Sequence, residues 1–532
     1  MTKLSLPLLL GLLVTSSAAQ DLTVSRIGKY NGKDDVDLLA VSGNIAAYSF
    51  ATTSCNIGDT DLPWNNETKN APLIGTNMLR VYQGRIEHLS YSFVKYGFCS
   101  ADSDGGGCPG DCTDSTPRGC DTLLNIGCAD VYSASLNDGR KGGAKWEIDP
   151  VTGIWPANPP TGPVGDQAIR GRIQVLDSEI TDPEAVVIIE GQYISIQDHG
   201  AGNARDNYGW RPVEIAANLT ASNSGPTQKG QPAIYAWQAY ADGVLIDDLA
   251  VENEGGAGVH GWMFLGSRAL DLGGGLWRYE FAVQNGNSAR GVGALSIPLP
   301  CDPDIVITDP FYRGVPHHSG SPYSNAAWTF AVVGDRAEWR TDDHASDPFA
   351  SAIRWGELSS FGFTANRAPA GGAASLELFV PGTPTELTGQ VIAPGALFEE
   401  TCTANANSTG VPAQLIGAGS DSVTQAELSF TITELPDDSL GYLLMSQNSD
   451  FVPFFSGSQG NLCLGSPIRR FVNDVLDSGT EGEVSTTLDF DDLPGNVEFQ
   501  PGERWFFQYW YRDMNPGSTS NTTPGVSVTF CD

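Results

Sequence analysis

Short stretches in which apolar and polar residues alternate dominate the chain. In 275–284, Trp277, Tyr279, Phe281 and Val283 fall on one face of an extended strand, while Leu276, Arg278, Glu280 and Ala282 fall on the other. Alternation with a period of two is typical of a β-strand that buries one face. Further strand signals, separated by Asn-Gly, Asp-Gly, Pro-Gly and Gly-Gly breakers, lie at 185–189, 193–196, 374–380, 426–433, 504–511 and 526–530. These patterns predict a mainly β chain.

Helical patterns are scarce. The best helical candidate is 76–94, although its apolar residues are irregularly spaced. The 62 Gly and 33 Pro residues together exceed one residue in six, which is typical of many short elements joined by turns. Charged residues make up only 17% of the chain, against the ~25% usual in globular proteins. This composition excludes a charge-rich disordered chain and a long exposed coiled coil.

The breakers also divide the chain into units. At roughly 100–200 residues per domain, 532 residues correspond to three or four domains. We expect several antiparallel β-sandwich domains and a disulfide-rich N-terminal region. The expected units are a signal peptide at 1–19, a cysteine-rich β region at 20–170, a β-sandwich at 171–300, a β unit at 301–384 that is either separate or packed with the preceding one, a linker at 385–395 and a C-terminal β-sandwich at 396–532.

The first residues predict export. Lys3 is followed by an apolar run from Leu4 to Val14, which is too short to span a bilayer, and then by the small residues Ser17, Ala18 and Ala19. This is the pattern of a cleaved signal peptide, with an N-terminal anchor as the alternative. We therefore expect a secreted, extracellular or cell-surface protein with no stable membrane insertion after cleavage.

The cysteines agree with an oxidising compartment. Their number is even, and they fall into two groups that could close on themselves as three and two disulfides. Six cysteines allow 15 pairings and four allow 3, so the sequence leaves the connectivity open. Zinc binding by the first group would need reduced thiolates, which export disfavours. The two groups are Cys55, Cys99, Cys108, Cys112, Cys120 and Cys128, and Cys301, Cys402, Cys463 and Cys531.

The net charge of the chain limits the classes of partner that it is expected to bind. With 63 acidic and 29 basic residues, the formal net charge is −34 and the pI is about 4.3. Such a chain repels phosphate backbones, so nucleic-acid binding is not expected. The carboxylates either keep the protein solvated or bind divalent cations. Because they are scattered rather than clustered, the pattern favours solvation.

Histidines and aspartates near the middle of the chain form a candidate metal site. Neutral imidazoles and carboxylates together bind first-row divalent metals, which activate water. On a strand, two adjacent histidines would point to opposite faces, so only one would be a ligand; the alternative is a pair of ordinary loop histidines. The candidate ligands are His317, His318, Asp342 and His344.

Two further segments carry candidate ligands. Asp102 and Asp104, on a glycine-containing turn, could offer oxygens to calcium, with solvated turn carboxylates as the alternative. Asp206, Tyr208 and Trp210 could line a carbohydrate site, in which a ring stacks on a sugar and the carboxylate holds hydroxyls; the alternative is a loop with packed aromatic residues. Two Gly-x-Gly-x-x-Gly matches do not lie between a strand and a helix, so no dinucleotide cofactor is predicted.

Several motifs resemble an uncharacterised family of secreted, modular, β-rich proteins from environmental bacteria. They begin with Cys55-Asn-Ile-Gly-Asp59 and include Leu272-Gly-Gly-Gly-Leu-Trp-Arg-Tyr-Glu-Phe281. The resemblance implies secretion and β architecture and supplies no activity or catalytic residue. The remaining motifs lie at 75–82, 85–90, 127–137, 191–193, 201–203, 353–358, 507–513, 520–521 and 526–530, so the resemblance covers most of the chain.

The sequence therefore favours a secreted or cell-surface β protein with a non-catalytic binding, adhesion or structural role. Its partner would be an extracellular polymer, another protein or calcium. The alternative is a secreted metal-dependent hydrolase or another metalloenzyme that uses the His/Asp cluster with a transition metal. No catalytic residue is assigned, and the sequence leaves enzymatic activity open while favouring a non-catalytic role.

Overall fold

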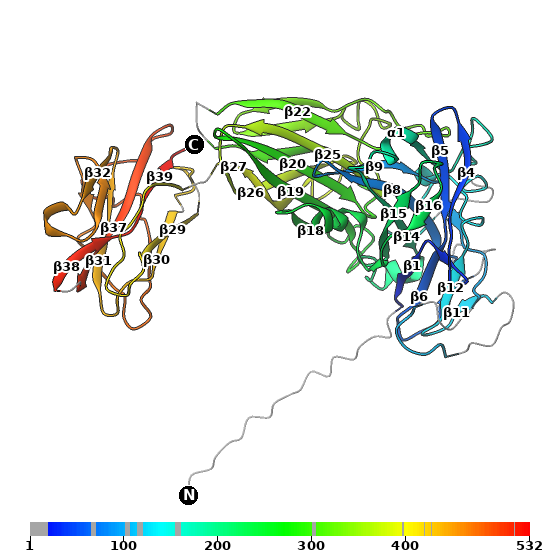
Figure 1. Ribbon diagram of the computed structural model, residues 1–532, viewed down its shortest axis with the longest axis horizontal. Coiled ribbons are helices and arrows are strands. Elements are labelled where there is room, and N and C mark those ends of the chain that lie inside the picture. The colour runs from blue at the N-terminus through cyan, green and yellow to red at the C-terminus, as the bar shows by residue number, and fades with distance from the viewer. Residues whose placement is uncertain are drawn as a thin grey trace, which may run out of the picture.

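The structure is a computed structural model (Figure 1). It describes residues 20–64, 71–101, 107–113, 121–154, 161–300, 305–395, 398–419, 421–426, 428–514 and 517–531. The expected signal peptide, the calcium candidates Asp102 and Asp104, and Cys120 and Cys301 lie outside the described residues. The fold is mainly β with antiparallel sheets, as the alternating patterns predict. The described part contains no helix long and apolar enough to cross a membrane.

The first unit is built on one large antiparallel sheet in the order β10-β8-β14-β15-β16, with β9 paired to β8 and β17 paired to β15. Its strands are β8 (Leu73–Tyr82), β9 (Arg85–Tyr91), β10 (Lys95–Tyr96), β14 (Val186–Ile194), β15 (Tyr208–Ile215), β16 (Ala221–Asn223) and β17 (Gln228–Lys229).

Smaller sheets complete the first unit. They are β1 (Leu22–Ile27) with β6 (Thr52–Asn56) and β12 (Ala129–Tyr132); β4 (Val36–Ser42) with β5 (Ile45–Phe50) and β13 (Ile173–Leu176); β2 (Lys29–Tyr30) with β3 (Lys33–Asp34); and β7 (Leu62–Pro63) with β11 (Leu123–Leu124).

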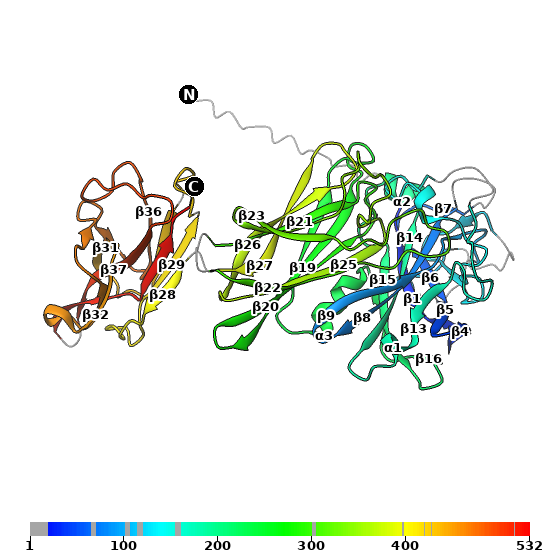
Figure 2. The same ribbon diagram turned by 90° about the horizontal axis from the view of Figure 1, so that it is seen from above.

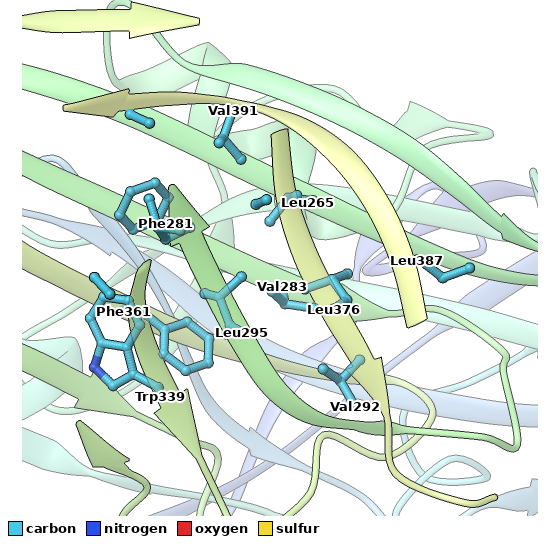
Figure 3. Close-up of a cluster of buried hydrophobic side chains, with 14 of the residues drawn as sticks. Leu265, Phe281, Val283, Val292, Leu295, Trp339, Phe361, Leu376, Leu387 and Val391 are labelled. Atoms are coloured by element: carbon cyan, nitrogen blue, oxygen red, sulfur yellow. The ribbon is translucent and has the colours of Figure 1, made fainter. Parts of the chain in front are cut away.

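The second unit is a sandwich of two five-stranded sheets in the orders β18-β19-β20-β25-β22 and β23-β24-β21-β26-β27. The strands are β18 (Leu245–Val251), β19 (Gly261–Gly273), β20 (Leu276–Asn285), β21 (Val292–Pro298), β22 (Ile307–Arg313), β23 (Thr329–Val333), β24 (Arg336–Arg340), β25 (Glu357–Ala365), β26 (Pro369–Leu378) and β27 (Glu386–Pro394). Figure 3 shows side chains of both sheets meeting between them. The boundary between the first and second units therefore falls between β17 and β18.

The third unit is a C-terminal sandwich, seen at one end of the molecule in Figures 1 and 2. Its sheets are β28-β39-β37-β31-β34, with β35 and β38 alongside, β29-β30-β36, and the hairpin β32-β33. The strands are β28 (Glu399–Cys402), β29 (Gln414–Gly419), β30 (Leu428–Thr433), β31 (Leu440–Ser446), β32 (Ser449–Pro453), β33 (Asn461–Leu464), β34 (Arg469–Arg470), β35 (Leu476–Asp477), β36 (Val484–Thr487), β37 (Arg504–Met514), β38 (Ser518–Thr522) and β39 (Gly525–Thr529).

Helical segments are short and lie between strands. They are η1 (Lys145–Glu147), α1 (Asp177–Ile180), α2 (Ile196–Gly200), η2 (Ala233–Tyr235), α3 (Ala236–Tyr240) and η3 (Phe455–Gly457). The helix expected at 76–94 is wrong, because this segment forms the β8–β9 hairpin, which turns at Gln83 and Gly84 with positive φ angles of 50° and 76°. Both faces of β8 are buried, so its apolar residues need not alternate, and the period-two signal is lost.

The first and second units share a hydrophobic core and form one body. Leu79 and Ile86 of the hairpin pack with Trp237 of α3, and from the second unit Phe264 of β19 and Leu358 of β25 join the same cluster. Figures 1 and 2 show the hairpin beside β25 from two directions. β20 therefore buries both faces. The aromatic face points into the sandwich, as its alternation predicts, and the opposite face meets the first unit.

Disulfides link residues within each of the two cysteine groups. Cys55 pairs with Cys108 and Cys112 pairs with Cys128 in the first unit, while Cys402 pairs with Cys463 in the third. Cys99 and Cys531 are also disulfide-bonded. These links close loops of 53, 16 and 61 residues, which restricts the unfolded chain and so stabilises units with short elements.

Candidate functional site

The residues of the expected metal site occupy two separate places. His317 and His318 lie in the loop between β22 and β23, whereas Asp342 and His344 follow β24. The His344 ring packs on Phe379 at 5.1 Å, and these two residues and Asp342 line a recess of about 360 Å³. Within the described ranges, no group of three or more His, Cys, Asp and Glu side chains is arranged to hold a metal ion.

His318 is buried at the interface between the first and second units, which we call the joint. Its ring stacks on Tyr91 of β9 at 4.9 Å. Its Nε2 lies 3.0 Å from the Tyr91 carbonyl oxygen and its Nδ1 lies 3.1 Å from the Gln174 amide nitrogen. These partners fit the neutral tautomer, in which Nε2–H donates and Nδ1 accepts. Burial lowers the pKa of His318 to about 4. Both ring nitrogens are therefore used within the protein.

The depressed pKa of His318 predicts a specific loss of stability in acid. The unfolded histidine takes up a proton as the pH falls through 6.5, whereas the folded one does so only near 4. Protonation therefore favours the unfolded state across this window, and the stability lost approaches about 3 kcal/mol at its lower end. The difference in unfolding free energy between the wild type and His318→Gln, measured by denaturant titration from pH 7 down to about 4, should shrink by that amount. A pH-independent difference would contradict this prediction.

His317 and Glu357 form the centre of the joint. The His317 Nδ1 atom lies 3.2 Å from the Tyr91 hydroxyl and 3.6 Å from Glu357 Oε1. The other carboxylate oxygen of Glu357 accepts a hydrogen bond from the Arg354 backbone N–H at 2.9 Å. Burial also lowers the pKa of His317, although the nearby Glu357 carboxylate opposes this effect. The arrangement places a neutral imidazole against a carboxylate that the backbone holds in position.

Lys145 is buried beside this pair. Its ammonium lies 4.8 Å from the Tyr91 ring centroid and 4.7 Å from that of Trp355, and it reaches the Gly356 carbonyl oxygen at 3.4 Å. Burial lowers the pKa of Lys145 to about 8, against the opposing attraction of Glu357 and Glu190. Two aromatic faces and two carboxylates thus replace the water that the ammonium loses.

Other buried polar groups tie the two units together. The Glu190 carboxylate accepts hydrogen bonds from Asn77 at 2.6 Å and from Gln284 at 2.8 Å, and burial raises its pKa. His88 Nδ1 accepts from the Leu358 backbone N–H at 3.1 Å, so its Nε2–H faces the Ser90 carbonyl at 3.0 Å. The Glu190–Gln284 and His88–Leu358 hydrogen bonds cross the joint, and the second of them ties β9 to β25.

A cavity of about 260 Å³ opens beside His317, at the start of β25. We call it the His317 recess. Gly314 is required at its wall, since a Cβ atom there would stand 2.5 Å from the Tyr312 hydroxyl oxygen. Tyr312 itself stacks on the buried Trp328 ring, with centroids 5.5 Å apart, so its position is fixed. The polar lining is Tyr312, His317, Ser324, Asn325, Ser351, Glu357 and Ser359.

The expected carbohydrate-binding residues do not form an open site. Tyr208 and Trp210 are 0% and 4% exposed and pack in the core shared by the first two units, so neither ring offers a face to a ligand. They lie on β15, where both faces are covered, which the sequence pattern of one loop could not reveal. Asp206 lies just outside, and burial together with Asp21 and Asp198 raises its pKa to about 7.

Of the residues that meet at the joint, the sequence singled out only His317 and His318. Tyr91, Lys145 and Glu357 come from three other segments and carry no motif or spacing that would group them. Lys145 and Glu357 lie in segments that carry other charged residues, such as Glu147 and Arg354, so their local sequence gives no signal that would single them out.

Comparisons with known proteins give no family for the chain. No family model matches it, and no curated protein does. Among solved structures, it is similar over part of its length to a β-1,2-glucanase from Parabacteroides distasonis. The alignment covers 54% of this chain and 37% of the glucanase, with 10% sequence identity and a TM-score of 0.11.

Proposed function

We propose that this is a secreted or cell-surface protein with a non-catalytic binding role, and that the His317 recess takes a hydroxyl-rich ligand such as one or two sugar units of an extracellular polymer. The observation that carries the proposal is the lining of the recess. Hydroxyl, amide, imidazole and carboxylate groups converge on one cavity beside a fixed aromatic ring. Such a mixture of donors and acceptors suits sugar hydroxyls.

Contacts within the protein hold the walls of the recess in place. Tyr312 is fixed by stacking on Trp328, and Asn325 holds the loop by accepting from the His317 backbone N–H at 2.7 Å and donating to the His317 carbonyl at 3.0 Å. A preformed site loses little conformational entropy on binding. Its volume of about 260 Å³ is just below the ~300 Å³ of the smallest drug-sized pockets, which suits a short segment of a chain.

The titratable side chains that line the recess favour binding of a saccharide over its hydrolysis. Glycosidases place two carboxyl groups across the bond that they cleave. Among the described residues that line the recess, Glu357 is the single carboxylate. The imidazole of His317 is kept neutral by burial and occupied at Nδ1, which leaves Nε2 for a hydrogen bond to a ligand. The disulfides and the expected signal peptide support a location outside the cytosol.

Blocking the recess should abolish binding. Ala326 lies on its exposed rim, so Ala326→Trp would fill the opening without touching the buried joint. The probe is a panel of neutral di- to hexasaccharides from plant, algal and bacterial polysaccharides, with affinities of the hits measured by calorimetry. We expect Ala326→Trp to weaken binding by at least about a hundredfold, since a filled pocket loses most of its contacts.

The matched control is Ala345→Trp, an exposed alanine on the rim of the separate recess near His344. It should leave the affinity unchanged. Equal losses in both variants, or no binding by any saccharide of the panel, would refute the proposal. Mass spectrometry of the incubated saccharides provides the second readout, because release of shortened products would show that the site is catalytic.

A further inference from the structure

A second recess of about 270 Å³ lies on the first unit, between β10 and the loop that follows β12. We call it the Lys95 recess. Three of its nine lining residues are cationic: Lys95, Arg140 and Lys141. In the whole chain only about one residue in 18 is Lys or Arg, and the net charge is −34. The recess is thus a concentrated positive site on a strongly acidic protein.

The cations of the recess are poorly neutralised by the protein. Asp138 is the carboxylate in the lining, and it is shared, at 3.6 Å from Arg140 and 3.5 Å from Arg172. Lys141 is exposed and forms no ion pair with a described residue. Surface cations that stay unpaired attract anions over a Debye length, which is about 8–10 Å at physiological salt.

Lys95 lines the recess and is held by contacts within the protein. Its ammonium donates to the Tyr96 carbonyl oxygen and lies over the rings of Phe98 and Tyr132, at 4.5 Å and 5.3 Å from their centroids. Burial lowers its pKa to about 8 against the opposing attraction of the Asp130 carboxylate, so most of it stays protonated at neutral pH. A largely buried ammonium gains more from an added anion than an exposed one, because less water screens the pair.

The rim also carries an apolar element. Leu136 is 43% exposed and lines the same recess as the three cations. An inorganic oxyanion would use only the charges, whereas an acidic sugar would place its carboxylate or sulfate on the cations and its ring on the leucine. We infer that the Lys95 recess binds an acidic saccharide that bears a carboxylate or sulfate group. This inference goes beyond the proposed function, which concerns neutral hydroxyls at a different recess.

The test measures binding of three probes to the full chain by calorimetry: oligogalacturonate, a sulfated galactan oligosaccharide and inorganic sulfate. We expect one or both acidic saccharides to bind, and the affinity to fall as salt rises from about 50 to about 200 mM. Arg140→Gln combined with Lys141→Gln should weaken this binding at least about tenfold. Both side chains are exposed, so the fold should be unaffected. Leu136→Ser should weaken saccharide binding and leave sulfate binding unchanged.

The charge-matched control replaces two exposed cations elsewhere, Lys33→Gln together with Arg470→Gln. It should change the affinity by less than about twofold. Equal losses in both double variants would assign binding to the general charge of the protein and overturn the inference. So would inorganic sulfate binding as tightly as the saccharides, or no binding of any probe. The Ala326→Trp variant should retain acidic-saccharide binding, which separates this inference from the proposed function.

Discussion

Replacing Trp339 with alanine should lower the free energy of unfolding of the second unit by about 3–5 kcal/mol. Trp339 is 1% exposed at the centre of the sandwich, with ring centroids 4.9 Å from Phe330, 5.4 Å from Phe361 and 5.9 Å from Phe363 (Figure 3). Its removal would leave a cavity that both sheets line, and rigid strands close such a space only in part.

Hydrogen exchange of β24 and β25 measures this effect directly. The loss of stability should speed the slowest amides by about a hundredfold or more, since each 1.4 kcal/mol is tenfold. Amides of β30 and β37, in the third unit, provide an internal reference that should not change. Val333→Ala, at a side chain 58% exposed on the neighbouring strand β23, is the matched control, and it should shift stability by less than about 0.5 kcal/mol. Unchanged exchange in Trp339→Ala would contradict the role assigned to this ring.

Replacing Glu280 with alanine should destabilise the joint between the first two units by about 3–5 kcal/mol. The Glu280 carboxylate, on β20, binds Arg85 of the β8–β9 hairpin through two contacts of 2.7 Å and Arg278 through a third of 2.7 Å. Glu280 is only 6% exposed. Its loss would leave two largely buried guanidinium groups without their main carboxylate, and the desolvation cost would remain.

The control for Glu280 is Glu338→Ala. Glu338 also binds an arginine, Arg340, at 2.9 Å, but both side chains are partly exposed and Arg340 keeps Glu377 at 2.7 Å. Exposed pairs contribute about 0–1 kcal/mol, so this variant should be nearly neutral. Thermal and denaturant unfolding of the two variants provide the comparison, with exchange of β9 amides as the local readout. A Glu280→Ala protein as stable as Glu338→Ala would show that Glu280 does not stabilise the joint.

The alternation of apolar and polar residues predicted those strands in which one face is apolar and the other is polar. The alternation in β20 predicted its core face, and Phe281 and Val283 lie in the hydrophobic cluster of the sandwich. The alternation rule failed in β8, because both faces of this strand are buried. One face packs in the core of the first unit, and the other packs in the core that the first two units share. With both faces apolar, the period-two signal that separates a strand from a helix is missing.

The composition of the candidate site could be predicted only in part. The sequence points to His317 and His318 as an adjacent pair; His317 lines the proposed recess, whereas His318 is held against Ser90 and Tyr91 in the joint. Their expected partners Asp342 and His344 lie near Phe379 instead, since the β23–β24 hairpin separates the two loops. Their actual partner Tyr91 is 226 residues from His317 in the chain. Tyr208 and Trp210, the candidates for stacking on a sugar, are instead buried in the core shared with the second unit, which begins after β17.

The sequence by itself determined the mainly β class, the core faces of strands with one buried side, and the grouping of the described disulfides. Each of these depends on neighbours in the chain, on turn residues, or on the oxidation of thiols. Only the tertiary structure decided that β20 is covered on both faces, that Lys145 meets Glu357, and that three cations surround one recess. Such contacts join segments far apart in the chain, and the local pattern of a segment does not say which distant segment packs against it.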